Sequence, residues 1–416
     1  ICPTRHWMSK APPGAGPKEE RKAAVEKPEI PHRLRALIGQ SVDAIDTPAL
    51  VVDLHAANRN LQRMAEFAAK HRLRLRPHAK MHKSAEFARL QLQAGAIGLC
   101  AQTVAEAEAL GAGGVNDVFI SNEILAVPKL RRVAALAHQL KSRGGQLAIA
   151  VDSFEGVERL AQAMQLTNAV IDVFIELDIG HGRCGVASPD AAVQLAQLIS
   201  RRSTGLRYAG LHAYHGAAQH LRSVDERRQA LTDAAARLNA ARDALAAAEL
   251  APPLVTGAGV GAFPIESASG LWGEIQPGSF LFMDRDYLQN ERDPAQPQFE
   301  PALFVKSQVI SVGEKHAVCD AGHKSHAIDS GLPAVHTLPG QARLEFANGG
   351  DEHGVLKPLD YGGALPTLPE LGETVWLIPG HCDPTVNLHE ALIVVRDGIA
   401  AGRVEAVVPV QARGVW

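Results

Sequence analysis

Three groups of residues in this 416-residue chain have types and spacings that suit chemistry. The first is Lys80, within the run RPHAKMHK at residues 76–83, because a lysine amine can form a Schiff base with a carbonyl group. The second is Gly257-x-Gly259-x-Gly261, where backbone N–H groups can approach an anion since no Cβ intervenes. Each has an ordinary alternative: a solvated basic patch for the lysine, and a tight turn for the glycines.

The third group is His381 and Asp383, which stand two residues apart. If this segment is extended, both side chains point to one face and Cys382 points away, because strand side chains alternate. Imidazole plus carboxylate suits Mn²⁺, Mg²⁺ or Zn²⁺, and two protein ligands leave positions for water and substrate. An isolated His-x-Asp is more often structural, so the interpretation depends on its surroundings.

From about residue 46 the chain alternates between short apolar runs and amphipathic stretches, which predicts strands that are each followed by a helix. The predicted strands cover residues 73–79, 96–101, 117–122, 147–152, 171–179, 207–214, 254–257 and 273–279. Alternating strands and helices predict a parallel sheet. Eight units in about 210 residues favour a closed (β/α)8 TIM-type barrel, with a doubly wound open sheet as the alternative.

The remaining segments complete the predicted domain organisation. Residues 1–44 are expected to be a flexible extension, either a linker or the remnant of a targeting segment, because prolines are frequent and hydrophobic periodicity is weak. Residues 45–55 contain a strand that we expect to join a second domain. Residues 56–290 form the barrel. Residues 291–416 are predicted to be an all-β domain, because short β-branched runs alternate with Gly, Pro and Asp.

Active sites of such barrels lie at the C-terminal ends of the strands. The residues at or just after the ends of the predicted strands are Lys80, Arg183, Tyr214, His215, Thr256, Gly257, Gly259, Gln276, Gly278 and Ser279. A lysine and two glycine-rich loops across one barrel mouth suit pyridoxal phosphate, since the lysine can hold its aldehyde and the loops its phosphate.

Ordered motifs make this pattern specific. They are DTPALVVD at 46–53, ISNE at 120–123, GRCGV at 182–186, AYHG at 213–216, QPGS at 276–279 and HCDPTVNL at 381–388. With these motifs, residues 45–416 resemble the alanine-racemase-type (fold type III) pyridoxal phosphate enzymes, and within them the D-threonine aldolase and D-serine dehydratase group.

The resemblance implies a role for each candidate residue. Lys80, rather than Lys83, carries the cofactor, and Arg183 lies beside its phenolic oxygen. Tyr214 and His215 project into the site. The alternatives are that Arg183 is an ordinary surface residue and that Tyr214 and His215 form a buried hydrogen-bond network. The residues implied to bind the cofactor beyond these are Thr256, Gly257, Gly259, Gln276, Gly278 and Ser279.

The resemblance also implies a divalent metal at His381 and Asp383, most readily Mn²⁺ or Mg²⁺, with Zn²⁺ as a further option. The resemblance implies His-x-Cys at this point in the D-serine dehydratase branch, whereas this chain has His-x-Asp. Asp383 therefore favours the aldolase branch. The implied reaction cleaves D-threonine and other D-β-hydroxy-α-amino acids to glycine and an aldehyde, with the metal lowering the pKa of the hydroxyl and His215 accepting its proton.

Other reactions and cofactor arrangements stay open at this stage. The main alternative is a D-serine or D-threo-3-hydroxyaspartate dehydratase, which forms a 2-oxo acid and ammonia. An amino-acid racemase is disfavoured by the metal pair, and a non-catalytic pyridoxal phosphate carrier by the extra β domain. A barrel without a cofactor is the remaining alternative. The group is commonly dimeric, so we expect a homodimer. The roles of Asp320, His323 and His353 stay open.

Composition restricts the class of protein further. The chain is 46% hydrophobic with a net charge of −3, and it has no run of 18 apolar residues, so we expect neither a nucleic-acid partner nor a membrane span. The five cysteines are scattered, which predicts a soluble intracellular protein in a reducing compartment. The sequence does not separate cytoplasm from organelle.

Overall fold

The computed structural model describes residues 30–359 and 367–414. Of the predicted extension at 1–44, residues 1–29 lie outside the described residues. The rest is folded: it contains α1 (His32–Arg35) and η1 (Val42–Ala44) and lies against β17 (Arg403–Pro409). Gly39 donates its N–H to the carbonyl of Val404 at 2.8 Å, and Ile30, Leu34 and Leu37 pack on a buried cluster. The apolar residues of this segment explain why it docks on the β domain.

Residues 74–275 hold eight parallel strands in the order β2-β9-β8-β7-β6-β5-β4-β3. Their bounds are β2 Arg74–Leu75, β3 Leu99–Ala101, β4 Asp117–Ile120, β5 Gln146–Val151, β6 Ile171–Glu176, β7 Leu206–Ala213, β8 Val255–Gly257 and β9 Glu274–Ile275. A parallel bridge between His78 and Cys100 joins the two ends of this order. The predicted barrel is confirmed, and each predicted strand run overlaps one of these strands.

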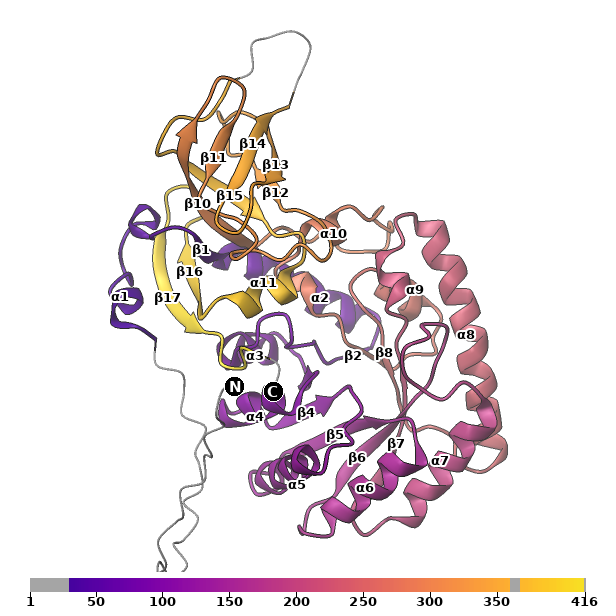
Figure 1. Ribbon diagram of the computed structural model, residues 1–416. Helices are drawn as coiled ribbons and strands as arrows, with labels where there is room; N and C mark the ends of the chain where they lie inside the picture. The colour runs from indigo at the N-terminus through magenta and orange to yellow at the C-terminus, as the bar shows by residue number, and fades with distance from the viewer. Residues whose placement is uncertain (1–29, 360–366, 415–416) are drawn as a thin grey trace, which may run out of the picture.

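Helices cover the outside of the barrel (Figure 1). They are α2 Leu54–Lys70, α3 Ala85–Gln93, α4 Val104–Ala112, α5 Val127–Lys141, α6 Phe154–Met164, α7 Pro189–Arg201, α8 Val224–Ala247 and the short α9 Phe263–Ala268. Several begin at a Ser, Thr or Asp that accepts a backbone N–H of the first turn, such as Thr103 in a capping box with Glu106. Within residues 30–359 and 367–414, no helix is both long enough and apolar enough to cross a membrane.

The first barrel strand is shorter than predicted. The sequence predicts a strand over 73–79, but β2 ends at Leu75. Pro77 has no N–H to donate, so the regular ladder stops. Residues 76–79 still follow the sheet through single bonds, with Arg76 donating to Ile275 at 3.0 Å and Ala79 to Cys100 at 2.8 Å. The chain therefore reaches the barrel mouth as an irregular segment, and Lys80 lies at its end.

The C-terminal domain is built on a nine-stranded sheet with the order β13-β14-β11-β10-β1-β16-β17, and β15 and β12 pair beside β10. The strands are β1 Ala49–Asp53, β10 Leu303–Val312, β11 Ala317–Cys319, β12 Ala334–His336, β13 Leu344–Asn348, β14 Gly354–Pro358, β15 Thr374–Ile378, β16 Ala391–Arg396 and β17 Arg403–Pro409. The sequence places β1 with this domain, and β1 lies between β10 and β16.

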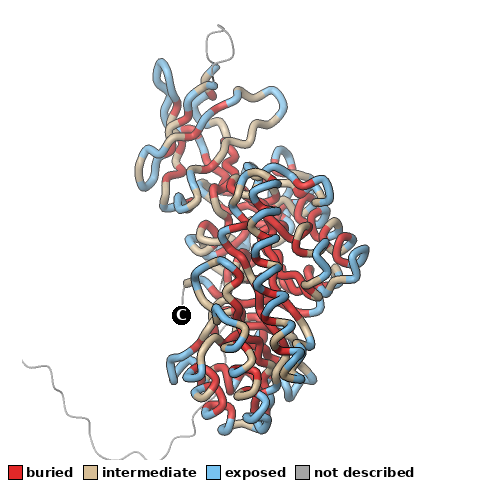
Figure 2. Tube along the Cα trace, turned by 90° about the vertical axis from the view of Figure 1, so that its right-hand side faces the viewer, coloured by how far each residue is buried: buried red, intermediate tan, exposed pale blue. Residues whose placement is uncertain are grey.

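A shared core joins the barrel to the β domain. Met64 and Phe67 on α2 pack in one cluster with Phe282, Leu303 and the buried Cys382. Figure 2 shows buried residues continuing from the barrel toward the β domain. Apolar burial at this junction stabilises the position of each domain relative to the other. The short segment 379–383, which carries His381 and Asp383, is thereby held over the barrel mouth.

Candidate active site

A cavity of about 430 Å³ lies at the C-terminal ends of the barrel strands, against the β domain. Nine of the residues predicted from the sequence line it: Lys80, Arg183, Tyr214, Gly259, Gln276, Gly278, Ser279, His381 and Asp383. Further lining residues that the sequence prediction did not include are His78, Gln102, Ser121, His181, His212 and Tyr287. His215, Thr256 and Gly257 are not among the lining residues.

Lys80 faces Asp383 across this cavity. Its Nζ lies 2.6 Å from Oδ2 of Asp383, and the lysine side chain is 43% exposed. The Asp383 carboxylate raises the pKa of Lys80 although burial acts in the opposite direction. Burial favours neutral Asp383, but Lys80 and His381 hold its pKa below the usual range. The Lys80 ammonium and the Asp383 carboxylate therefore form an ion pair in the cavity.

Lys83, the other lysine of the same run, has a different environment. Its Nζ donates to Oδ1 of Asn387 at 2.9 Å and to the carbonyl of Gly414 at 2.8 Å, and it lies 3.4 Å from Glu106. This side chain is nearly buried and ties the barrel to the C-terminal segment. Its contacts give Lys83 a structural role, which leaves Lys80 as the lysine of the cavity.

His381 and Asp383 lie at the start of α11 (Cys382–Leu388), so the expected extended segment is wrong beyond His381. His381 itself has extended dihedral angles and is the N-cap residue. Asp383 and Pro384 fall in the first helical turn, where proline is tolerated because no intrahelical N–H bond is needed. The two side chains still face each other, with Nε2 of His381 3.8 Å from Oδ1 of Asp383.

Two residues near the end of the barrel fix this helix start. Asp284 accepts the N–H of Cys382 at 2.9 Å and the N–H of Tyr287 at 3.1 Å. Burial raises the pKa of Asp284 to about 6. Ser279 donates its hydroxyl to Oδ1 of Asp383 at 3.3 Å. Ser279, which was predicted to contact the phosphate, thus also contacts Asp383. Asp284 was missed because its role depends on a distant segment.

A chain of buried polar side chains crosses the barrel, and two of its members, His212 and Gln276, line the cavity. His212 contacts Glu176 through Nδ1 and Gln276 through Nε2, the latter at 3.1 Å. Gln276 donates to Oγ1 of Thr256 at 2.7 Å, and Thr256 donates to Glu274 at 2.8 Å. Burial disfavours charged His212, but Glu176 raises its pKa overall. The hydroxyl of Thr256 is therefore used inside the barrel, away from the cavity wall.

The glycine loops pack tightly behind the cavity wall. A Cβ on Gly257 would lie 2.0 Å from the carbonyl oxygen of Ala213, and one on Gly259 would lie 2.6 Å from Oε1 of Gln219. A Cβ on Gly278 would lie 2.9 Å from the carbonyl oxygen of His78. Gly259 and Gly278 present backbone to the cavity, which suits an anion, whereas Gly257 is needed for strand packing.

The sequence predicts that His215 projects into the site, but in the structure His215 is not among the residues that line the cavity. Its Nδ1 accepts the N–H of Ala218 at 3.3 Å, and its Nε2 lies toward Gly180. His181 lines the cavity instead, and its ring centre is 6.2 Å from that of His215. Burial lowers the pKa of both histidines, so both are neutral near pH 7. Arg183 lies beside Tyr214, with its guanidinium carbon 5.8 Å from the ring centre.

His78 is a cavity residue that the motif RPHAK contains but the sequence analysis did not single out. Its Nε2 lies 3.1 Å from both Gln102 and Ser121, and its Nδ1 accepts the N–H of Lys80 at 3.3 Å. Burial lowers the pKa of His78 to about 3, so the ring is neutral. The bond to the Lys80 N–H fixes the backbone from which the reactive lysine projects.

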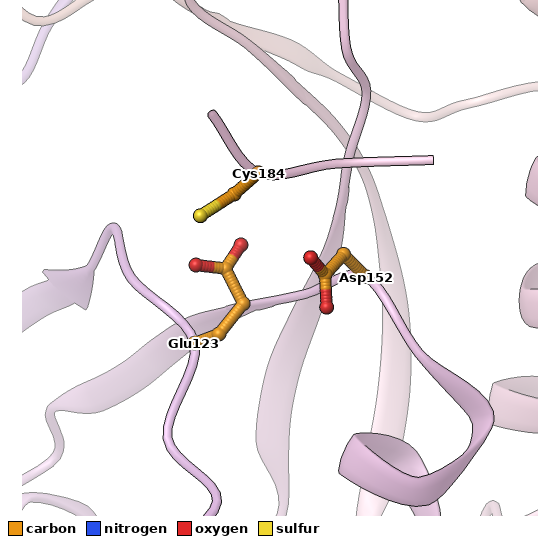
Figure 3. Close-up of side chains that lie close together, drawn as sticks. All are labelled: Glu123, Asp152 and Cys184. Atoms are coloured by element: carbon orange, nitrogen blue, oxygen red, sulfur yellow. The ribbon is translucent and has the colours of Figure 1, made fainter. Parts of the chain in front are cut away.

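Glu123, Asp152 and Cys184 meet in the loops after β4, β5 and β6 (Figure 3). A carboxylate oxygen of each acid and Sγ of Cys184 all lie within 4.8 Å of one another. Asp152 accepts the N–H of Gly185 at 3.2 Å. Burial and Glu123 raise the pKa of the Cys184 thiol to about 11, so the thiol is protonated and hydrogen-bonds Glu123. These contacts hold the loop that carries His181 and Arg183.

The three residues left open have contacts outside the cavity. Asp320 accepts hydrogen bonds from the hydroxyl groups of Thr47 and Ser307 at 2.5 and 2.7 Å, which tie the segment before β1 to β10. His323 pairs with Asp351 at 2.7 Å. His353 is exposed. None of the three is among the residues that line the cavity in the described part of the chain.

A parallel barrel is joined to a β domain, and a lysine, glycine loops and a His–Asp pair lie at the junction of the two. This arrangement is typical of the active site of a barrel enzyme. Residues 52–286 match the family model "Alanine racemase, N-terminal domain", and residues 302–395 match "Putative serine dehydratase domain". The chain belongs to the alanine racemase N-terminal domain family, and the resemblance drawn from its motifs is confirmed.

Three relatives are similar over nearly their whole length. A 3-hydroxy-D-aspartate aldolase of Paracoccus denitrificans is 39% identical, covering 93% of this chain and 97% of the relative. A D-threonine aldolase of Arthrobacter sp. is 40% identical, covering 90% and 95%. The crystal structure of D-threonine aldolase from Filomicrobium marinum is 41% identical, covers 91% of this chain and 98% of that one, and superposes with a TM-score of 0.84.

Proposed function

We propose that this protein is a pyridoxal phosphate- and divalent-metal-dependent aldolase that cleaves D-β-hydroxy-α-amino acids, D-threonine among them, to glycine and an aldehyde. The observation that carries the proposal is the meeting of Lys80, Asp383 and His381 in one cavity. The relatives named as aldolases of D-threonine and 3-hydroxy-D-aspartate support this type of reaction.

The cavity residues fit pyridoxal phosphate. Lys80 supplies the amine, while the backbone that Gly259 and Gly278 present to the cavity, together with Ser279, suits the phosphate. Tyr214 and Arg183 lie next to each other in the cavity wall and can flank the cofactor ring. The bound cofactor would supply an electron sink for the pair released when a bond to the substrate Cα breaks.

The His381 and Asp383 pair fits a divalent metal. The two ligand atoms are 3.8 Å apart, and an ion about 2.0–2.2 Å from each could contact both. A nitrogen and an oxygen donor suit Mn²⁺, Mg²⁺ or Zn²⁺. A metal here would lower the pKa of a coordinated hydroxyl. Lys80 is adjacent to this pair, so a substrate whose own amine takes the place of the lysine amine would have its β-hydroxyl near His381 and Asp383.

A neutral histidine beside Tyr214 is proposed to take the hydroxyl proton. His215 is the candidate that the sequence gives, and His181 is the alternative because it lines the cavity. When the Cα–Cβ bond breaks, its electron pair stays with Cα and the hydroxyl oxygen becomes the carbonyl of the aldehyde. A proton then added to Cα gives glycine, so atoms and electrons balance.

The proposed homodimer is supported by three exposed apolar side chains near the barrel mouth. Leu125, Val127 and Phe154 are 45%, 49% and 50% exposed. Apolar side chains gathered at the surface favour burial against another molecule. Sedimentation of the purified protein checks this directly: a single species of twice the chain mass is expected, and a monomer at all concentrations would contradict it.

A product assay tests the proposed reaction. The purified protein is incubated with D-threonine, L-threonine or 3-hydroxy-D-aspartate, before and after chelation and readdition of Mn²⁺ or Mg²⁺. We expect glycine and an aldehyde from a D substrate only, with activity lost on chelation and restored by metal. Ammonia and a 2-oxo acid would replace the aldolase with a dehydratase, and activity that persists after chelation would remove the metal from the proposal.

A further inference from the structure

The loop between β11 and β12 places a carboxylate behind the proposed metal pair. Oδ2 of Asp329 lies 2.6 Å from Nδ1 of His381, although the two residues are 52 positions apart in the chain. The Oγ of the adjacent Ser330 is 3.4 Å from the same ring nitrogen. Nδ1 of His381 is therefore engaged, and Nε2 is the ring nitrogen that faces Asp383.

We propose that Asp329 is a positioning residue of this site: it accepts a hydrogen bond from Nδ1–H of His381, fixes the ring orientation and leaves the Nε2 lone pair directed toward Asp383. A neutral imidazole carries one proton, so a carboxylate acceptor at Nδ1 places that proton there and frees Nε2 for a cation. Carboxylates behind metal-binding histidines have this effect in many proteins. This inference rests on the proposed metal site.

The loop that carries Asp329 is itself held against α11. The N–H of Ala327 donates to Oγ1 of Thr385 at 3.0 Å, and His389 contacts the carbonyl of Ser325 at 2.8 Å. On the other side of Asp329, Arg285 donates to the carbonyl of Leu332 at 2.8 Å. Contacts on both sides of Asp329 keep its carboxylate in place, even though the side chain is 51% exposed.

The β domain contains a matched pair that serves as a control. Asp351 contacts His323 at 2.7 Å and is also 51% exposed. This second Asp–His pair does not line the cavity. Asp351→Asn therefore removes a similar exposed pair from the same domain without touching the proposed metal site.

The experiment measures Mn²⁺ affinity by electron paramagnetic resonance of free Mn²⁺ in titrations of the cofactor-loaded protein. The variants are Asp329→Ala, Asp329→Asn, Asp351→Asn and His381→Ala. We expect Asp329→Ala to weaken Mn²⁺ binding about tenfold, at the low end of such effects because the carboxylate is half exposed. Asp329→Asn keeps an acceptor oxygen and should lose less, while Asp351→Asn should bind as wild type. Cofactor content and the thermal midpoint of the metal-free protein should be unchanged.

Two other outcomes separate the possible failures. If both Asp329 variants bind Mn²⁺ like wild type while His381→Ala does not, the positioning role is overturned and the metal site stands. If the wild-type protein itself takes up no Mn²⁺, or His381→Ala binds it equally well, the proposed metal site fails and the inference fails with it.

Discussion

Replacing Thr256 by valine separates two roles for this residue. Motif resemblance assigns Thr256 to the cofactor phosphate, whereas the structure places its hydroxyl in the buried chain between Gln276 and Glu274, with the residue fully buried. Valine has nearly the same shape but removes both hydrogen bonds. The lost donation to the charged Glu274 costs about 1.5–3 kcal/mol, and leaving the Gln276 amide without this acceptor costs about 1–3 kcal/mol.

We therefore expect Thr256→Val to lower the free energy of unfolding by about 3 kcal/mol or more, measured by urea denaturation of the cofactor-free protein. Thr256→Ser is the control: it keeps the hydroxyl and should lose only about 1 kcal/mol for the missing methyl group. Pyridoxal phosphate affinity, titrated by absorbance, should change little in either folded variant. A Thr256→Val protein of wild-type stability with much weaker cofactor binding would refute the structural role and restore the phosphate contact.

Two further predictions concern the cavity and its supporting loop. Since the pKa of Cys184 is raised to about 11, its thiolate fraction at pH 8 should be roughly 100-fold below that of an ordinary thiol, and its alkylation, followed by peptide mass spectrometry, should accelerate as pH rises. Glu123→Gln should speed that alkylation, and equal rates in the two proteins would contradict the contribution of Glu123 to the raised pKa of Cys184. His215→Asn should lower kcat by at least about 100-fold with cofactor still bound. If His181→Asn causes that loss and His215→Asn does not, the base is His181.

Much of the fold could be predicted because barrel strands and helices have local hydrophobic patterns. The eight strand runs, the junction after residue 290 and the strand at 48–54 are all visible in the spacing of apolar residues. The rule that barrel sites lie at strand C-termini then brings Lys80 and Gln276 to one end, although they are far apart in sequence. Both residues line the cavity.

Other features depend on contacts that a linear pattern does not contain. The start of α11 after His381 depends on Asp284, which lies about a hundred residues earlier in the chain and caps it through Cys382. Thr256 immediately precedes the glycine motif and so suggests a phosphate contact, but its buried neighbours decide where the hydroxyl points. Asp329 stands in a loop without a recognisable motif. Its proximity to His381 arises only when β11 and β12 join the same sheet.

The most direct test of the site is to locate the cofactor on the chain. The purified protein is loaded with pyridoxal phosphate, reduced with borohydride to fix the cofactor to its lysine, digested and mapped by mass spectrometry. Because Lys80 faces the cavity and Lys83 is held by Asn387 and Gly414, the account predicts the adduct on Lys80 alone. An adduct on Lys83, or cofactor bound without modification of Lys80, would contradict it.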